Sequence, residues 1–320
     1  MTLLPSIIAL VTGFVLLILS AGSFTDSGVK IASTYKISPL IIGILIFGFG
    51  TSAPEIFVSA LAAFEDHPEL AVGNAFGSNI LNIALVLGVT AMILPIKVNV
   101  KVIKKEWYFL IAYTLITGLL LWDRHLGFID GSILLGLLVI FLWITYKDSK
   151  KDHHDFDNLS SNVDSSQKIK IWTKLLISLV LLLVSAKLFV FAGTNIADYY
   201  HVSDLIIGLT VVALGTSLPE LAVAITSAIK KQHEMVVGNI IGSNIFNTVA
   251  VLAIPGLISP LTIQDEAVFQ DYLFMLVLTL LIYVFFIASP VTKMKDTLSR
   301  LEGFFLIIVL SIYFYFRILV

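Results

Sequence analysis

The chain has 320 residues, of which 58% are hydrophobic and only 13% charged, with a formal net charge of −2 and a mean hydropathy of +0.99. Soluble domains have about half of their residues apolar and about a quarter charged, so this composition excludes an ordinary soluble protein and predicts an integral membrane protein. The absence of cysteine excludes disulfides, thiolate metal sites and cysteine nucleophiles.

Ten apolar segments can cross a bilayer as helices, since a spanning helix takes about 20 mostly apolar residues. The alternating ten-residue pattern of a membrane barrel is absent from the sequence. We therefore predict an all-α membrane protein. In chain order, the predicted spans cover residues 4–23, 37–63, 70–95, 107–122, 127–146, 172–199, 204–229, 235–258, 268–288 and 303–319.

The second and third predicted spans share a pair of motifs with the seventh and eighth. GFGTSAPE at Gly48–Glu55 precedes GNAFGSNILN at Gly73–Asn82, and ALGTSLPE at Ala213–Glu220 precedes GNIIGSNIFN at Gly238–Asn247. One offset of 165 residues relates all equivalent positions. A repeat without insertions indicates two copies of one unit.

Five spans in each copy is an odd number, so the second copy enters the membrane in the opposite sense. Inverted repeats are a recurrent transporter architecture, in which discontinuous helices from the two halves meet at a site near the midplane. We divide the chain into a first five-helix repeat at residues 1–146, a polar linker at 147–171 and a second five-helix repeat at 172–320.

Basic residues are concentrated on one side of this predicted topology. Six lysines flank the linker, and with the alternate loops that side collects 17 of the 20 basic residues. Because positive loops tend to remain inside the cell, this side and the linker are predicted to be cytoplasmic and both termini outside.

Each copy places one carboxylate, Glu55 or Glu220, inside a predicted span, where acids are costly and generally functional. The adjacent Pro54 and Pro219 lack an N–H and release the carbonyl four residues back. In lipid, such groups are tolerated only when buried in protein or lining a hydrated cavity. Two buried acids beside freed carbonyls predict a pathway for cations.

At helical spacing each motif forms a stripe of oxygen-bearing groups without thiolate or imidazole. Ca²⁺ takes about 6 to 8 such oxygens, whereas Mg²⁺ demands a stricter octahedral geometry; Na⁺ would also accept them. The stripes consist of Gly48, Thr51, Ser52 and Glu55; Ala213, Thr216, Ser217 and Glu220; Asn74, Ser78 and Asn82; and Asn239, Ser243 and Asn247.

The paired motifs resemble the α-repeats of the cation/calcium exchanger superfamily, in its compact prokaryotic sodium/calcium exchanger type. The double GTSxPE and GSNxxN pattern is highly specific, and the inverted layout extends the resemblance over nearly the whole chain. The resemblance implies an antiporter that exchanges Ca²⁺ for Na⁺ by alternating access in a prokaryotic inner membrane, and not an enzyme. It implies the two ions and the bilayer as partners, no cofactor and no nucleic acid. A monomer is compatible with the sequence, which leaves the oligomeric state open.

The resemblance also implies roles for individual residues. Ca²⁺ would be bound by Glu55, Glu220, Thr51 and Thr216, and Na⁺ by the same glutamates with Ser52, Ser78, Ser217 and Ser243. The carbonyls of Gly48 and Ala213, with Asn82 and Asn247, would complete the set. Many relatives, including the potassium-dependent branch, carry Asp at the position of Asn247, which argues against potassium coupling.

Three alternatives remain open from the sequence. The proton-coupled branch of the superfamily shares the general design, so Ca²⁺/H⁺ exchange is the first alternative. A cation channel is the second, although channels favour rings of carbonyls or charges around a symmetric pore. An intramembrane enzyme is the third, but no HExxH motif and no paired intramembrane Asp supports it.

Overall fold

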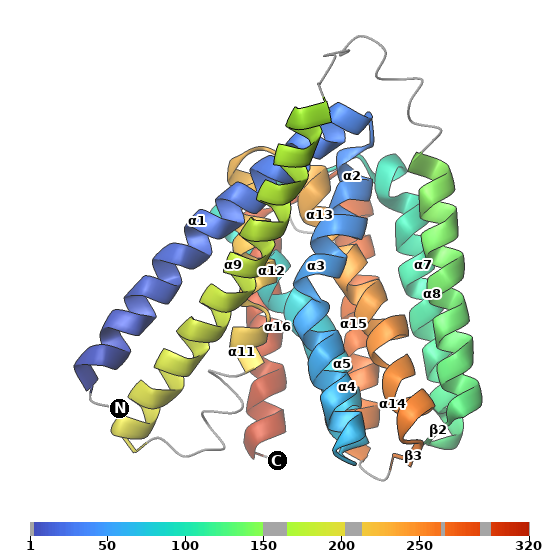
Figure 1. Cartoon of the computed structure of the whole chain (residues 1–320). Coiled ribbons are helices and arrows are strands. Elements are labelled where there is room, and N and C mark those ends of the chain that lie inside the picture. Colours follow the sequence, from blue (N-terminus) through green and yellow to red (C-terminus); the bar gives the residue numbers. More distant parts are fainter. Residues whose placement is uncertain (1–2, 150–164, 202–212, 264–265, 289–295, 320) are drawn as a thin grey trace.

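The computed structural model describes residues 3–149, 165–201, 213–263, 266–288 and 296–319, which form ten consecutive helical runs, as predicted (Figure 1). The first five runs are α1 (Leu3–Tyr35); α2 (Pro39–Ile42), η1 (Gly43–Gly48), α3 (Phe49–Thr51) and α4 (Ala53–Phe64); α5 (Pro68–Leu81), η2 (Asn82–Leu87) and α6 (Gly88–Ile93); α7 (Val100–Leu120) with η3 (Leu121–Asp123); and α8 (Phe128–Ser149). The second five are α9 (Ser165–Tyr199); α11 (Ala213–Thr216) and α12 (Leu218–Ile229); α13 (His233–Phe246), η7 (Asn247–Val251) and α14 (Ala253–Ile258); α15 (Glu266–Ala288); and α16 (Arg300–Leu319).

Within the described residues, six helices are individually long and apolar enough to cross a membrane. The bent pair Pro39–Thr51 and Ala53–Phe64, with an angle of 41°, makes a seventh span. Helices α7 and α16 lie at two of the other three predicted positions. Helices α11 and α12 lie in the third, the predicted span 204–229, of which residues 204–212 fall outside the described part of the chain. The fold is therefore an all-α membrane architecture, consistent with the predicted ten-helix inverted repeat.

Several helices are longer than the apolar segments that predicted them. Helix α1 continues to Tyr35, α7 begins at Val100 and α9 begins at Ser165. The added turns carry lysines, which end an apolar segment but not a helix, because a helix can continue into the headgroup region. Of the predicted linker, residues 150–164 lie outside the described part of the chain.

Two short antiparallel strand pairs join loops of the two halves. In each pair, one strand comes from the first half and the other from the second half. The pairs are β1 (Ile96–Lys97) with β4 (Thr297–Leu298), and β2 (His125–Leu126) with β3 (Leu261–Thr262). The two repeats therefore contact each other through paired strands in their loops as well as through their helices.

Helix α13 approaches α2 and η1 of the first repeat through glycines. A Cβ at Gly238 would lie 2.4 Å from the Leu40 carbonyl oxygen, and one at Gly242 would lie 2.7 Å from the Ile44 carbonyl oxygen. Only glycine permits these backbone contacts, which is the close packing typical of GxxxG segments. The contact brings the stripe of α13 against the GTSxPE segment of the other copy.

Gly238→Ala is expected to lower the free energy of unfolding by about 2 kcal/mol or more, because the added methyl group must push two backbones apart. The measurement is the unfolding midpoint in detergent. Gly136→Ala is the matched control, since nothing described lies within 4 Å of a Cβ there. The control should be neutral or stabilising by about 1 kcal/mol, because alanine favours a helix over glycine. Equal midpoints for the two variants would contradict the close approach.

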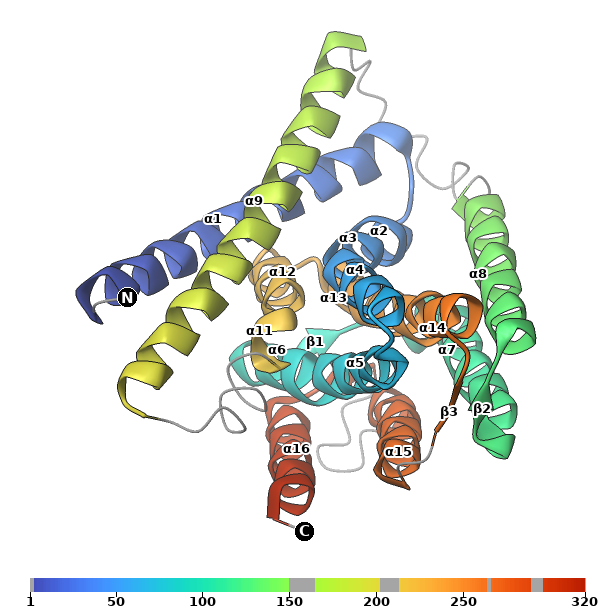
Figure 2. The same ribbon diagram turned by 60° about the horizontal axis from the view of Figure 1, so that its bottom comes forward.

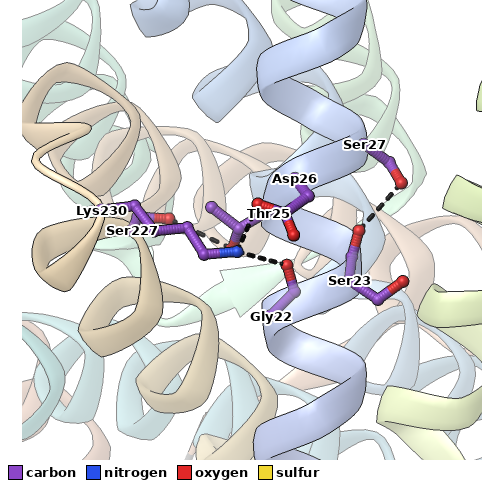
Figure 3. A network of polar contacts seen from close by, with 7 residues as sticks. All are labelled: Gly22, Ser23, Thr25, Asp26, Ser27, Ser227 and Lys230. Atoms are coloured by element: carbon purple, nitrogen blue, oxygen red, sulfur yellow. Dashed lines mark hydrogen bonds and ion pairs between the residues drawn. The ribbon is translucent and has the colours of Figure 1, made fainter.

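Helices α1 and α9 cross along one side of the molecule, away from α7 and α8 (Figures 1 and 2). Helix α1 is tied to the end of α12 by Lys230, whose Nζ donates to the Gly22 carbonyl at 2.7 Å and to Asp26 Oδ1 at 2.5 Å (Figure 3). The hydroxyls of Thr25 and Ser227 lie 3.5 Å apart beside this ion pair. These contacts connect α1 to the helix that carries Glu220.

Candidate functional site

The candidate site lies where the helices that carry the GTSxPE motifs break. Ser52 (φ −82°, ψ 1°) and Ser217 (φ −87°, ψ 3°) leave the helical conformation at equivalent positions. A new helix, α4 or α12, follows each serine and has proline in its first turn, where the missing N–H costs no hydrogen bond. Glu55 and Glu220 stand in these first turns, where the positive end of the helix dipole favours a carboxylate.

Both glutamates are removed from solvent, with only 1% of each residue exposed. Among the described residues, Glu55 Oε2 and both carboxylate oxygens of Glu220 have no hydrogen-bond partner. Buried polar atoms normally find partners, and an unpaired buried charge is costly. The arrangement therefore favours a cation between or beside the two carboxylates.

Four further side chains of the predicted set are buried and lack a partner in the described part of the chain. They form two equivalent pairs, the serines at the helix breaks and the asparagines at the end of the GSNxxN motifs. With the glutamates, they present seven such oxygens: Ser52 Oγ, Glu55 Oε2, Asn82 Oδ1, Ser217 Oγ, Glu220 Oε1, Glu220 Oε2 and Asn247 Oδ1. Carboxylate, hydroxyl and amide oxygens are the kinds of ligand that hard cations such as Ca²⁺ take in proteins.

Direct contacts join the GTSxPE segment of the first repeat to the GSNxxN stripe of the second. Thr51 Oγ1 donates to the Phe47 carbonyl at 2.9 Å and to Asn239 Oδ1 at 3.4 Å. Ser243 Oγ lies 3.4 Å from Thr51 Oγ1 and donates to the Gly48 carbonyl at 3.3 Å. Residues almost 200 positions apart in the chain thus share one polar centre.

The remaining predicted residues are placed less directly. Asn74 Nδ2 donates to the Glu55 carbonyl at 3.1 Å and to Ser59 Oγ at 3.0 Å, which fixes α5 against α4. Ser78 is buried and Thr216 is half-buried. Ala213 is the first residue of α11, and the structure describes its backbone only.

The motifs did not predict the π-helical turns beside these residues. The turns η2 and η7 begin at Asn82 and Asn247, the equivalent final asparagines, and η1 ends at Gly48. π-Helical turns are rare and occur frequently at functional sites. They widen the helix locally, so three of the predicted positions lie at a change of helical pitch.

A second pair of asparagines was also missed. Asn79 Nδ2 donates to Thr248 Oγ1 at 2.9 Å and approaches Met275 Sδ at 3.1 Å. Its equivalent, Asn244, is equally buried, and neither amide atom has a hydrogen-bond partner among the described residues. Their sequence signal is the GSN triplet that both copies share, in which each asparagine directly follows the predicted serine.

Comparisons with known proteins agree with this architecture. The sodium/calcium exchanger protein family model matches residues 5–147 and 170–319. The protein named CaxA from Alkalimonas amylolytica is 40% identical over 308 residues, which cover 94% of this chain and 95% of that protein. The inner membrane protein YrbG of Escherichia coli (strain K12) is 37% identical over 280 residues, or 85% of this chain and 86% of YrbG.

The fold is also similar to a solved structure of the sodium-calcium exchanger NCX_Mj, soaked with zero Na⁺ and Ca²⁺. The TM-score is 0.84 at 30% sequence identity, and the alignment covers 98% of this chain and 99% of that one. The family model spans both repeats, and the relatives align over almost their whole length. The chain therefore belongs to the sodium/calcium exchanger family, whose members are cation/Ca²⁺ antiporters and not enzymes.

Proposed function

We propose that this antiporter exchanges Ca²⁺ for Na⁺ by alternating access, at one site built from both repeats. The observation that supports the proposal is the set of seven buried oxygens that have no hydrogen-bond partner in the described part of the chain, contributed by equivalent residues of the two copies. Carboxylates, hydroxyls and amides are the ligands that Ca²⁺ prefers, and a site shared by inverted halves can be opened to either side by moving one half against the other.

In this proposal the two glutamates bind both cargo ions in turn. Thr51 and Thr216, with the carbonyls of Gly48 and Ala213, complete the Ca²⁺ site; the serines and final asparagines provide the additional Na⁺ positions. The contact of Ser243 with Thr51 and the Gly48 carbonyl supports a shared centre. The Na⁺ positions are the residues Ser52, Ser78, Ser217 and Ser243, with Asn82 and Asn247.

Ca²⁺/H⁺ exchange is the second candidate, because the same two carboxylates could carry protons instead of Na⁺. The neutral hydroxyl and amide oxygens can bind Ca²⁺ in either mechanism, so the preference for Na⁺ rests on the match to the sodium/calcium exchanger family. The test is uptake of radiolabelled Ca²⁺ into proteoliposomes loaded in turn with Na⁺, with K⁺ and with an acidic interior. Uptake only into Na⁺-loaded vesicles supports the proposal, and uptake driven by the acidic interior supports the alternative.

We also propose that the linker at residues 147–171 faces the cytoplasm and that both termini lie outside. The repeats at 1–146 and 172–320 are then inserted in opposite senses. The asymmetry of the lysines supports this orientation. The name of YrbG, an inner membrane protein, supports the corresponding membrane.

The orientation predicts the labelling of single cysteines, because the chain has none of its own. An impermeant maleimide should label Ser165→Cys only in inverted vesicles and His67→Cys only in right-side-out cells. Both positions are exposed and lie in the connections at opposite ends of the predicted topology. Labelling of the two cysteines from the same side would contradict the odd number of spans between them.

A further inference from the structure

A surface groove of about 570 Å³ runs between the crossing helices α1 and α9. None of the residues that line it belongs to the candidate site. The surface of its walls is mostly apolar, with Leu16 and Leu19 from α1 and Ile177 and Leu181 from α9. Four hydroxyl residues also line it, namely Ser20, Ser23, Thr173 and Ser178. Leu19 is 63% exposed and Ile177 55% exposed, so these side chains face the surroundings of the helices and not the protein core. In a membrane protein this surface meets acyl chains.

One end of the groove is positively charged. Lys170 and Lys174 line it and stand one turn apart on α9, so both ammonium groups lie on one face. The described part of α9 from Ser165 to Ala197 contains no acid. Asp26 of α1 is paired with Lys230 and does not line the groove (Figure 3).

An aromatic pair marks the depth of the charged end. Trp172 lies between the two lysines in the sequence, and its Nε1 donates to the Tyr35 hydroxyl at 2.9 Å. Tryptophan and tyrosine are enriched at the level of the lipid headgroups. From Lys170 to Leu181 the helix rises about 17 Å, since each residue adds about 1.5 Å. One leaflet of hydrocarbon is about 15 Å thick, half of a bilayer core, so the groove matches the depth of a single leaflet.

The inverted repeat shows that the charge is not a general property of this surface. The offset of 165 residues makes Pro5 the equivalent of Lys170 and Ala9 the equivalent of Lys174. The corresponding surface at the opposite end of α1 therefore lacks both cations. The two lysines occur only on the side that collects most of the basic residues of the chain.

We propose that this groove binds one anionic phospholipid, with the phosphate at Lys170 and Lys174 and an acyl chain along the aliphatic wall between α1 and α9. The charge selects an acidic headgroup, and the length and lining of the groove select a lipid chain over a soluble anion. The binding is independent of the ion-exchange proposal, because none of the lining residues belongs to the candidate cation site.

Native mass spectrometry of the purified protein with phosphatidylglycerol and phosphatidylcholine of the same chain length tests this site. We expect wild type to retain one phosphatidylglycerol with a preference of about thirtyfold, equivalent to about 1 kcal/mol for each lysine near an anionic lipid. The double variant Lys170→Gln/Lys174→Gln should lose this preference. Lys104→Gln/Lys147→Gln is the matched control, because these lysines lie over Tyr108 and Trp143 on α7 and α8.

A second pair of variants tests the place of the acyl chain. Leu19→Trp should fill the groove and reduce retention of both lipids, whereas Leu176→Trp, at an exposed α9 residue outside the lining, should not. The proposal is overturned if the double groove variant keeps the preference, or if the control lysines remove it equally. It is also overturned if Leu19→Trp and Leu176→Trp retain equal amounts of lipid.

Discussion

Glu55→Gln and Glu220→Gln are each expected to reduce Na⁺-driven Ca²⁺ uptake by about a hundredfold or more. Each substitution removes one of the two buried charges that would balance a divalent ion. A unit-charge pair 4 Å apart contributes about 4 kcal/mol at an effective dielectric constant of about 20, and every 1.4 kcal/mol corresponds to about tenfold in binding. The measurement is the initial rate of radiolabelled Ca²⁺ uptake into Na⁺-loaded proteoliposomes.

The control for these variants is Glu302→Gln, which neutralises an equally buried glutamate outside the site. Glu302 Oε2 accepts hydrogen bonds from the N–H and the hydroxyl of Ser299, both at 2.8 Å, as a capping box at the start of α16. Glutamine can serve the same cap, so this variant should retain most of the uptake. Substantial uptake by either site variant, at equal protein incorporation, would contradict the shared site.

Exchange is expected to depend strongly on the membrane potential. Two carboxylates with one Ca²⁺ sum to zero charge, whereas the same carboxylates with three Na⁺ sum to +1. If three Na⁺ exchange for one Ca²⁺, as we propose, the Na⁺-loaded site would carry one positive charge across the membrane. One charge that crosses the full field changes the free energy by about 2.3 kcal/mol for each 100 mV, which corresponds to about fiftyfold at equilibrium.

A potassium diffusion potential imposed with valinomycin measures this dependence. In Na⁺-loaded vesicles, an interior-positive potential should accelerate Ca²⁺ uptake, because it drives the net positive charge of three Na⁺ outward against one Ca²⁺. Reversing the potassium gradient should slow uptake. Identical rates at both polarities would indicate two Na⁺ for each Ca²⁺ and an electroneutral exchange.

The apolar segments predicted the ten helical runs and the repeated motifs predicted the helix breaks, because both follow from local chemistry. Pro54 and Pro219 start new helices, and the constant offset makes the two copies equivalent. The structure then placed Thr51 and Ser243, one from each copy, 3.4 Å apart. No local pattern could predict this contact, which depends on the glycine approach of α13 to the first repeat.

Other features depend on packing between distant segments and were not predictable from the motifs. Asn79 bonds to Thr248, whereas the amide of Asn244 has no partner among the residues that the structure describes. The two copies differ here because Ile83 takes the place of Thr248 in the first repeat. The contact of Lys230 with Asp26 joins residues 204 positions apart. The π-helical turns at Asn82 and Asn247 likewise have no signal in the hydropathy pattern.

The most direct test of the central claim is the number of Ca²⁺ ions that one chain binds. Equilibrium dialysis of the purified protein with radiolabelled Ca²⁺ should give one ion for each chain, displaced by Na⁺, and almost none for Glu55→Gln or Glu220→Gln. Two ions for each chain, with one retained in each variant, would show that each repeat holds its own ion and would contradict a single site shared by the two glutamates.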